Sequence, residues 1–151
     1  MTAENIPTSD IVKDKITCFK LNWCDCGLCC VEDMVQEELT IYRNDCILVL
    51  KELNGYGVVC SCEIIHIDPN KVTEFFEFLE KTCDKWENDY AVRVCDGSEW
   101  KVRMWHSSHK VKTVCGTVKY PPHGKKIERF IRSLIIDGKS LIAPKLFGCG
   151  Y

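Results

Sequence analysis

Residues 58–83 read VVCSCEIIHIDPNKVTEFFEFLEKTC, and they hold the clearest change of hydrophobic period in the chain. Residues 56–67 alternate with period two, which predicts a long strand with one face formed by Val58, Cys60, Cys62 and Ile64. Asp68 is a natural N-cap, and Pro69 suits the first position of a helix. Apolar side chains then follow at three- and four-residue steps: Val72, Phe75, Phe76, Leu79, Cys83 and Trp86. We therefore predict a strand that leads directly into a helix whose apolar side lies across a sheet.

The rest of the chain is predicted to add more strands and a second helix. Alternation indicates strands over residues 15–23, 39–42, 46–53, 90–95, 100–106 and 109–120, whereas 31–35 have the spacing of one or two short helical turns. Apolar positions from Ile127 to Leu134 predict an amphipathic helix that ends before Asp137. Strands cluster before each helix, so we predict an α+β fold. Its two layers would be a mainly antiparallel sheet of about six or seven strands and two helices packed on one face.

Two local patterns set more specific expectations for the strands. In the first strand, Thr17, Phe19, Leu21 and Trp23 are predicted to share one face, with Ile16 on the other. Asn54-Gly55 predicts a tight hairpin because both residues tolerate positive φ. Asp96-Gly97 and Ser107-Ser108 are predicted to supply further turns, so the later strands are expected to form an antiparallel meander.

The composition is that of one ordinary globular domain. The 151 residues are 46% hydrophobic and 28% charged, with a formal net charge of -2. We predict a flexible tail over residues 1–13 and a single α+β domain over 14–151. No secretory signal or membrane-spanning run is recognised, which predicts a soluble, cytoplasmic protein with no membrane or nucleic-acid partner. In a reducing compartment its twelve cysteines would be thiols or metal ligands.

Residues 96–134 carry a recognisable set of marks: Asp96-Gly97, then Trp100, then Gly116, and finally Tyr120-Pro121 before an amphipathic helix. In these marks the stretch resembles small uncharacterised bacterial α+β proteins, although Val118 stands where their pattern has Asn. The resemblance implies an antiparallel hairpin whose last strand turns at Tyr120-Pro121 into the closing helix. It carries no activity that transfers to this chain.

The cluster Cys24, Cys26, Cys29 and Cys30 is the feature of the sequence closest to a chemical motif. A soft metal ion takes about four thiolates or imidazoles in a tetrahedron, and the turn from Cys26 to Cys29 would aim two of them at one point. These four cysteines are the predicted ligands of zinc or iron if a metal is bound. The second pair of ligands beside Cys26 and Cys29 could be Cys24 with Cys18 or Cys30. It could also be the strand pair Cys60 and Cys62, if the first strand and the long strand over residues 56–67 are neighbours.

Two other interpretations of the cysteines compete with the metal site. Cysteines also stand singly in predicted strands and in the helix, where they pack like small apolar residues: Cys46, Cys83, Cys95 and Cys115. If the chain uses cysteine in this way, no cofactor is needed, and this is the favoured interpretation. The third interpretation is thiol redox chemistry at Cys26 and Cys29, because a thiol at the start of a short helix has a lowered pKa.

The histidines and acidic pairs give no pattern specific for catalysis, so we expect a protein that is not an enzyme and has no catalytic residues. His106 and His109 flank the Ser107-Ser108 turn, where histidines are most simply exposed turn residues. Aromatic side chains are predicted to face away from the core at Trp105, Tyr42, Tyr120 and Phe78, unless residues 141–147 cover them.

If these aromatic side chains are exposed together, they form an apolar patch suited to a protein partner. The sequence therefore favours a non-enzymatic interaction protein, of the inhibitor, immunity or adaptor type, which acts through a face or an edge of its sheet. Trp105, Tyr120 and Tyr42 are the predicted contacts with another protein. The alternatives are a zinc- or iron-binding module at Cys24–Cys30 and a thiol-redox protein.

Overall fold

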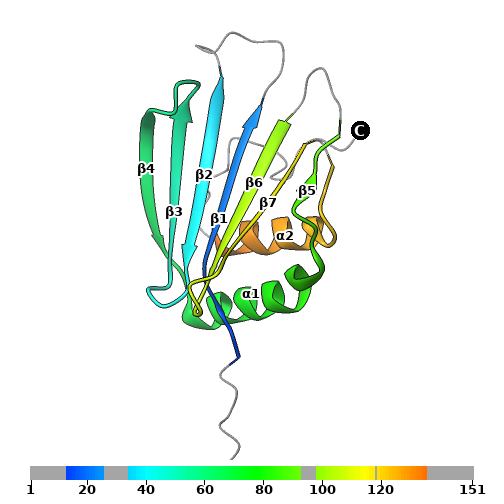
Figure 1. The fold of residues 1–151 in the computed structure, drawn as a ribbon. Helices are drawn as coiled ribbons and strands as arrows, with labels where there is room; N and C mark the ends of the chain where they lie inside the picture. The colour runs from blue at the N-terminus through cyan, green and yellow to red at the C-terminus, as the bar shows by residue number, and fades with distance from the viewer. Residues whose placement is uncertain (1–12, 26–33, 93–97, 118, 136–151) are drawn as a thin grey trace, which may run out of the picture.

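The computed structural model describes residues 13–25, 34–92, 98–117 and 119–135, and in them the chain forms a sheet with two helices on one face (Figure 1). This confirms the predicted α+β architecture. The sheet has seven strands in the order β4-β3-β2-β1-β6-β7-β5. The elements are β1 (Ile16–Asp25), β2 (Val35–Tyr42), β3 (Ile47–Asn54), β4 (Val59–His66), α1 (Pro69–Thr82), η2 (Cys83–Lys85), β5 (Asp89–Tyr90), β6 (Ser98–His106), β7 (Val111–Gly116) and α2 (Gly124–Leu134).

The start of α1 follows from its sequence as predicted. The Oδ1 atom of Asp68 accepts a hydrogen bond from the backbone N–H of Asn70 at 2.8 Å, which satisfies one of the free donors at the helix N-terminus. Pro69 occupies the first helical position. The whole predicted apolar side is buried, from Val72 in the first turn to Trp86 just beyond η2. This helix therefore lies across the sheet as its pattern requires.

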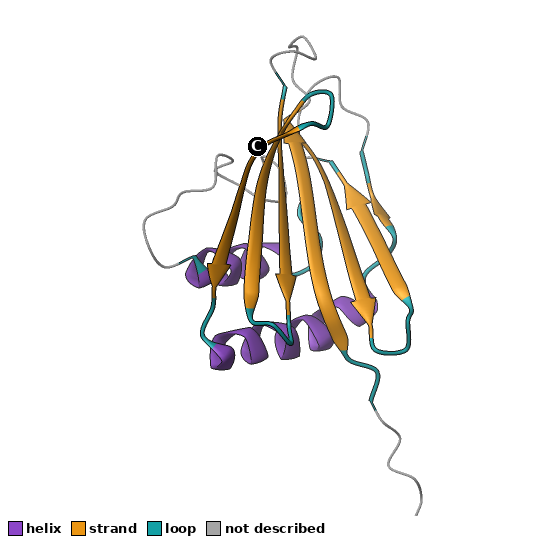
Figure 2. Cartoon of the chain, turned by 90° about the vertical axis from the view of Figure 1, so that its left-hand side faces the viewer, coloured by secondary structure: helices purple, strands orange, loops and turns teal. Residues whose placement is uncertain are grey.

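The core lies between the helix layer and one face of the sheet. At its centre the Phe75 ring of α1 packs edge-on against Phe19 of β1, Phe76 of α1 and Phe130 of α2, with centroids 5.4 to 5.5 Å apart. In both views the helices cross the lower part of the strands, and neither covers the opposite face (Figures 1 and 2). One face of the sheet is thus covered by neither α1 nor α2, and we call it the helix-free face.

The antiparallel meander is only partly right. Neighbouring strands are antiparallel except at the β5–β7 edge, where Asp89 and Tyr90 pair in parallel with the end of β7. In a meander the predicted strand over residues 90–95 would lie beside β6. Instead β5 has two residues and lies beyond β7. The buried indole of Trp86 donates to the carbonyl of Pro122 at 2.9 Å and ties the chain to the loop before α2, at the far side of β7.

Two other predictions of local structure are wrong for reasons of pairing. Ile16 is buried, because the β1–β6 register shifts between Ile16 and Cys18 and this irregularity turns Ile16 to the core face. The helical turns predicted over residues 31–35 are wrong at Val35, which is the first residue of β2 and pairs with Asn54. Continuous pairing with β3 therefore overrides the helical spacing in the described part of this stretch.

The β3–β4 turn is wider than the predicted Asn-Gly hairpin. The positive φ falls at Gly57, at 79°, and not at Asn54 or Gly55. The side-chain oxygen of Asn54 accepts from the backbone N–H groups of Tyr56 and Val58, each at 3.0 Å. The amide side chain thus holds a longer turn, so β4 begins at Val59 and not at Tyr56.

The ends of the predicted domain are described in part. Asp14 is tied to the β6–β7 turn, since its carboxylate accepts from the Ser107 and Ser108 hydroxyls at 3.0 and 2.8 Å. The hydrogen bonds from Ser108 lower the pKa of Asp14. Residues 1–12 of the predicted tail and the chain after Ile135 lie outside the described residues. Neither described helix is long and apolar enough to cross a membrane.

Candidate functional site

Six side chains form a row across the helix-free face of the sheet. Phe19 of β1 faces α1, so Cys18 beside it faces the other way. The strand registers place Tyr42 directly opposite Cys18 on one side and Trp105 directly opposite it on the other. Successive partners extend this alignment over six strands. We call these residues the cross-strand row: His66, Ile47, Tyr42, Cys18, Trp105 and Val111.

The cross-strand row is largely apolar and accessible. Tyr42 is 39% exposed and Val111 47% exposed, whereas Cys18, Ile47 and Trp105 are half-buried among their neighbours. Trp105 and Tyr42, predicted as partner contacts from the sequence, lie two strand spacings apart, or roughly 10 Å. The fold thus brings two of the three predicted contacts onto one surface.

Tyr120, the third predicted contact, lies elsewhere. Strand β7 ends at Gly116 and does not continue to Tyr120, so the alternation that placed this ring on the free face does not apply. Instead Tyr120 is half-buried before α2, where its hydroxyl donates to Glu128 at 3.2 Å and the Lys125 ammonium lies 5.6 Å from its ring centre. Phe78 was also expected opposite the core, but it stacks on Phe130 in the helix layer.

Two cations stand beside the cross-strand row. Lys101 and Arg103 occupy alternate positions of β6 before Trp105, so all three side chains face the same side. Both cations are exposed, and neither forms an ion pair with another described residue. Lys20 of β1, opposite Arg103, is paired with Glu38 of β2 at 3.3 Å. On β6 the exposed charge nearest Trp105 is therefore the positive charge of Arg103, whereas Lys101 lies about 13 Å from Trp105 along the strand and Glu99 takes the next position on the same side.

The predicted metal site lies mostly outside the described residues. Cys24 is buried near the end of β1, whereas Cys26, Cys29 and Cys30 are not described. Cys60 and Cys62 do not complete the site with β1 cysteines, because β2 and β3 separate β4 from β1 by about 14 Å. In residues 13–25, 34–92, 98–117 and 119–135, no group of three His, Cys, Asp or Glu side chains is placed to hold a metal.

Two of the described cysteines are shielded from ionisation. Burial raises the pKa of the Cys83 thiol to about 12, and the pKa of the half-buried Cys18 thiol to about 11 against the lowering effect of Lys20. A thiol that stays protonated at neutral pH is a poor nucleophile. Cys83 packs in the core beneath the sheet, which agrees with its interpretation as a small apolar side chain.

The difference in burial between these two thiols and the exposed thiols of Cys60 and Cys62 predicts an order of alkylation. At neutral pH, iodoacetamide is expected to label exposed Cys60 and Cys62 about tenfold or more faster than Cys18 and Cys83 in the native protein. A quenched time course read by peptide mass spectrometry measures the four rates together. Labelling in denaturant should remove the difference. Native labelling of Cys83 at the rate of Cys60 would contradict the burial of Cys83 in the core.

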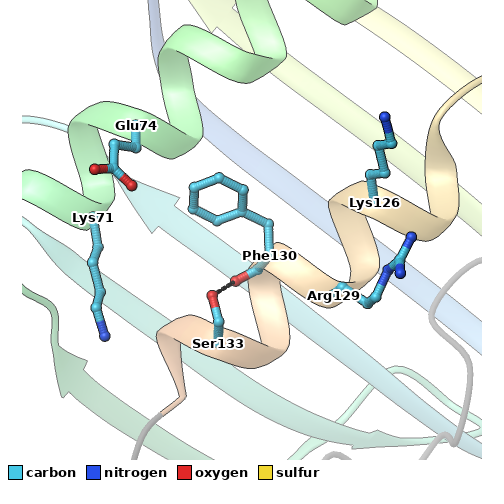
Figure 3. Close-up of a pocket in the computed structure, with 6 residues that line it drawn as sticks. All are labelled: Lys71, Glu74, Lys126, Arg129, Phe130 and Ser133. Carbon is cyan, nitrogen blue, oxygen red and sulfur yellow. Dashed lines mark hydrogen bonds between the residues drawn. The ribbon is translucent and has the colours of Figure 1, made fainter.

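A shallow groove between the helices was not predicted from the sequence. It has a volume of about 420 Å³ and is lined by Lys71, Glu74, Lys126, Arg129, Phe130 and Ser133. Figure 3 shows the Phe130 ring between the helices, while the charged ends around it point in different directions. Polar groups that do not converge give a small ligand no fixed orientation. Only the tertiary packing of α1 against α2 creates this groove, so no local sequence pattern could have shown it.

Comparison of the chain with protein-family models, curated proteins and solved structures gives no match. The resemblance of residues 96–134 to small bacterial α+β proteins stays a prediction. The structure nevertheless explains two of its marks. Gly116 lies opposite Trp100 in the β6–β7 pair, and the absence of a side chain at Gly116 leaves room for the Trp100 indole.

Proposed function

We propose that this domain binds an acidic protein through the helix-free face of its sheet, as a non-enzymatic inhibitor, immunity factor or adaptor. The observation that carries the proposal is the cross-strand row, in which Trp105 and Tyr42 flank Cys18 on a surface that neither helix covers. The pairing of the strands fixes the backbone positions of these residues before binding, which lowers the entropic cost of association. The complex would form in the cytoplasm, where the thiols stay reduced.

The chemistry of the surface supports a protein partner with carboxylates beside an apolar strip. Trp, Tyr and Arg are the side chains that most often dominate binding energy in protein interfaces, and all three occur here within neighbouring positions. Lys101 and Arg103 are exposed and carry no described ion pair, so they are available to carboxylates of the partner. Opposite charges at the rim of an interface mainly raise the association rate and the specificity.

Trp105→Glu is expected to weaken partner binding by about thirtyfold, because it removes the largest ring of the cross-strand row and places a carboxylate against an acidic partner. Arg103→Glu should weaken binding and reduce its sensitivity to salt. The purified domain is immobilised, a nuclease-treated lysate of the native cell is passed over it, and the affinity of the isolated partner is then measured for each variant. Lys126→Glu is the matched control, since it makes the same charge change on the helix layer and should bind normally.

Three outcomes decide the proposal. A partner lost with both β6 variants and retained with Lys126→Glu supports it, provided that circular dichroism shows all variants folded. A partner bound equally by all variants places binding elsewhere and overturns the proposal. A signal that is present with an untreated lysate and absent with the nuclease-treated lysate identifies a nucleic acid in place of a protein, because aromatic and basic side chains on a sheet can also stack and neutralise a single strand.

A further inference from the structure

The two edges of the sheet differ in how they are protected. At one edge β5 has only two residues, and such a short strand offers little backbone for pairing. At the other edge β4 has eight residues and pairs only with β3 among the described strands (Figure 1). Most of its side chains are exposed, and Val59–His66 contains no Lys, Arg or Pro; Glu63 is its one acidic residue.

The hydrogen-bond phase of β4 shows which backbone groups face outward. The N–H of Ile67 donates to the carbonyl of Cys46 at 2.9 Å, and these residues lie opposite each other one step beyond the His66–Ile47 pair. Hydrogen-bonded and non-hydrogen-bonded pairs alternate in an antiparallel ladder. Every second residue of β4, counted back from His66, therefore forms no backbone hydrogen bond with the residue opposite it in β3. Their N–H and C=O groups point away from β3: Cys62, Ile64 and His66.

We propose that a second copy of this chain pairs with β4 in an antiparallel fashion about a two-fold axis at Ile64. This axis places Ile64 opposite its own copy and Cys62 opposite His66 of the other copy. All three outward-facing residues then meet outward-facing residues, and each pair exchanges two backbone hydrogen bonds. The two sheets join into one.

The side chains fit a second copy of the same strand. On the helix-free face, Ile64 is 60% exposed and would pack against its own copy. On the other face, Glu63 would lie opposite Ile65 of the other copy, so no like charges stand directly across from each other. The β3–β4 register shifts between Ser61 and Val59 of β4, which lie outside the segment from Cys62 to His66. That segment is therefore regular and self-complementary.

Proline tests this edge with little disturbance to the fold. The N–H of Ile64 points outward, so Ile64→Pro removes a bond of the dimer and none of the β3–β4 ladder. Sedimentation equilibrium over a wide concentration range, in reducing buffer, is expected to show a reversible dimer for the unaltered chain and a monomer for Ile64→Pro. Ile64→Lys places two like charges at the axis and should also be monomeric. Val92→Lys, at an exposed valine that follows β5 at the opposite edge of the sheet, is the matched control and should dimerise.

The register has its own test. His66→Cys brings the new thiol opposite Cys62 of the other copy, at a separation that a disulfide spans. Diamide should then cross-link two chains, and adding Cys62→Ser should abolish the cross-link. A monomer at all concentrations overturns the proposal, as does a dimer that persists in both Ile64 variants or a dimer that fails to cross-link. If Ile64→Pro does not fold, Ile64→Lys decides the question alone.

Discussion

Phe75→Ala is expected to lower the free energy of unfolding by about 3–5 kcal/mol, the largest effect of any single substitution proposed for this chain. Phe75 is fully buried, and its ring contacts both the sheet and α2 through Phe19 and Phe130. Removal of the ring leaves a cavity between the layers, and the regular strands of the sheet have little freedom to fill it.

The measurement is urea denaturation at constant temperature, followed by circular dichroism, with the slope compared between variants. Phe78→Ala on the same helix is the matched control, because Phe78 is only half-buried and stacks on Phe130 at the rim of the core. Its loss should be clearly smaller. Equal losses for the two variants would show that the core is not centred on Phe75.

Gly116→Ala is expected to destabilise the protein by about 2–3 kcal/mol, since it forces an atom into space that the Trp100 ring fills. A Cβ atom at Gly116 would lie 2.6 Å from Trp100 Cε2 and 2.9 Å from its Nε1. The indole is 2% exposed, and its N–H is anchored to the Lys119 carbonyl at 3.1 Å, which restrains the ring from moving aside.

A double-mutant cycle separates this contact from the general effect of alanine in a strand. In a Trp100→Phe background the smaller ring leaves space, so Gly116→Ala should cost less than it does in the unaltered chain. Both unfolding free energies come from the same denaturation experiment. If the cost of Gly116→Ala is equal in the two backgrounds, the close approach of Gly116 and Trp100 does not limit the substitution.

The helices and most strands could be predicted because their signals are local. The N-cap at Asp68 and the spacing from Val72 to Trp86 are properties of one continuous segment, and the structure confirms both. Features that depend on a distant partner could not be predicted. The burial of Ile16 depends on a register shift against β6, and the place of β5 depends on the contact of Trp86 with Pro122.

The candidate surface was predictable in part for the same reason. Alternation along each strand placed Trp105 and Tyr42 on the free face, but it could not show that Cys18 joins them in one row, since that depends on two inter-strand registers. Tyr120 was assigned to the surface by extending an alternation beyond Gly116, where the strand ends. The exposed β4 edge likewise follows from the order of the strands, which no single segment encodes.

The most direct test of the proposed binding face is hydroxyl-radical footprinting of the chain in its native cell and in purified form, read by mass spectrometry. Tyr56, which is 67% exposed in the β3–β4 turn, serves as the internal reference. If an acidic protein occupies the helix-free face, Tyr42 and Trp105 should be oxidised several-fold less in the cell than in the purified domain, relative to Tyr56. Equal oxidation of Tyr42 and Trp105 in the two states would contradict the account.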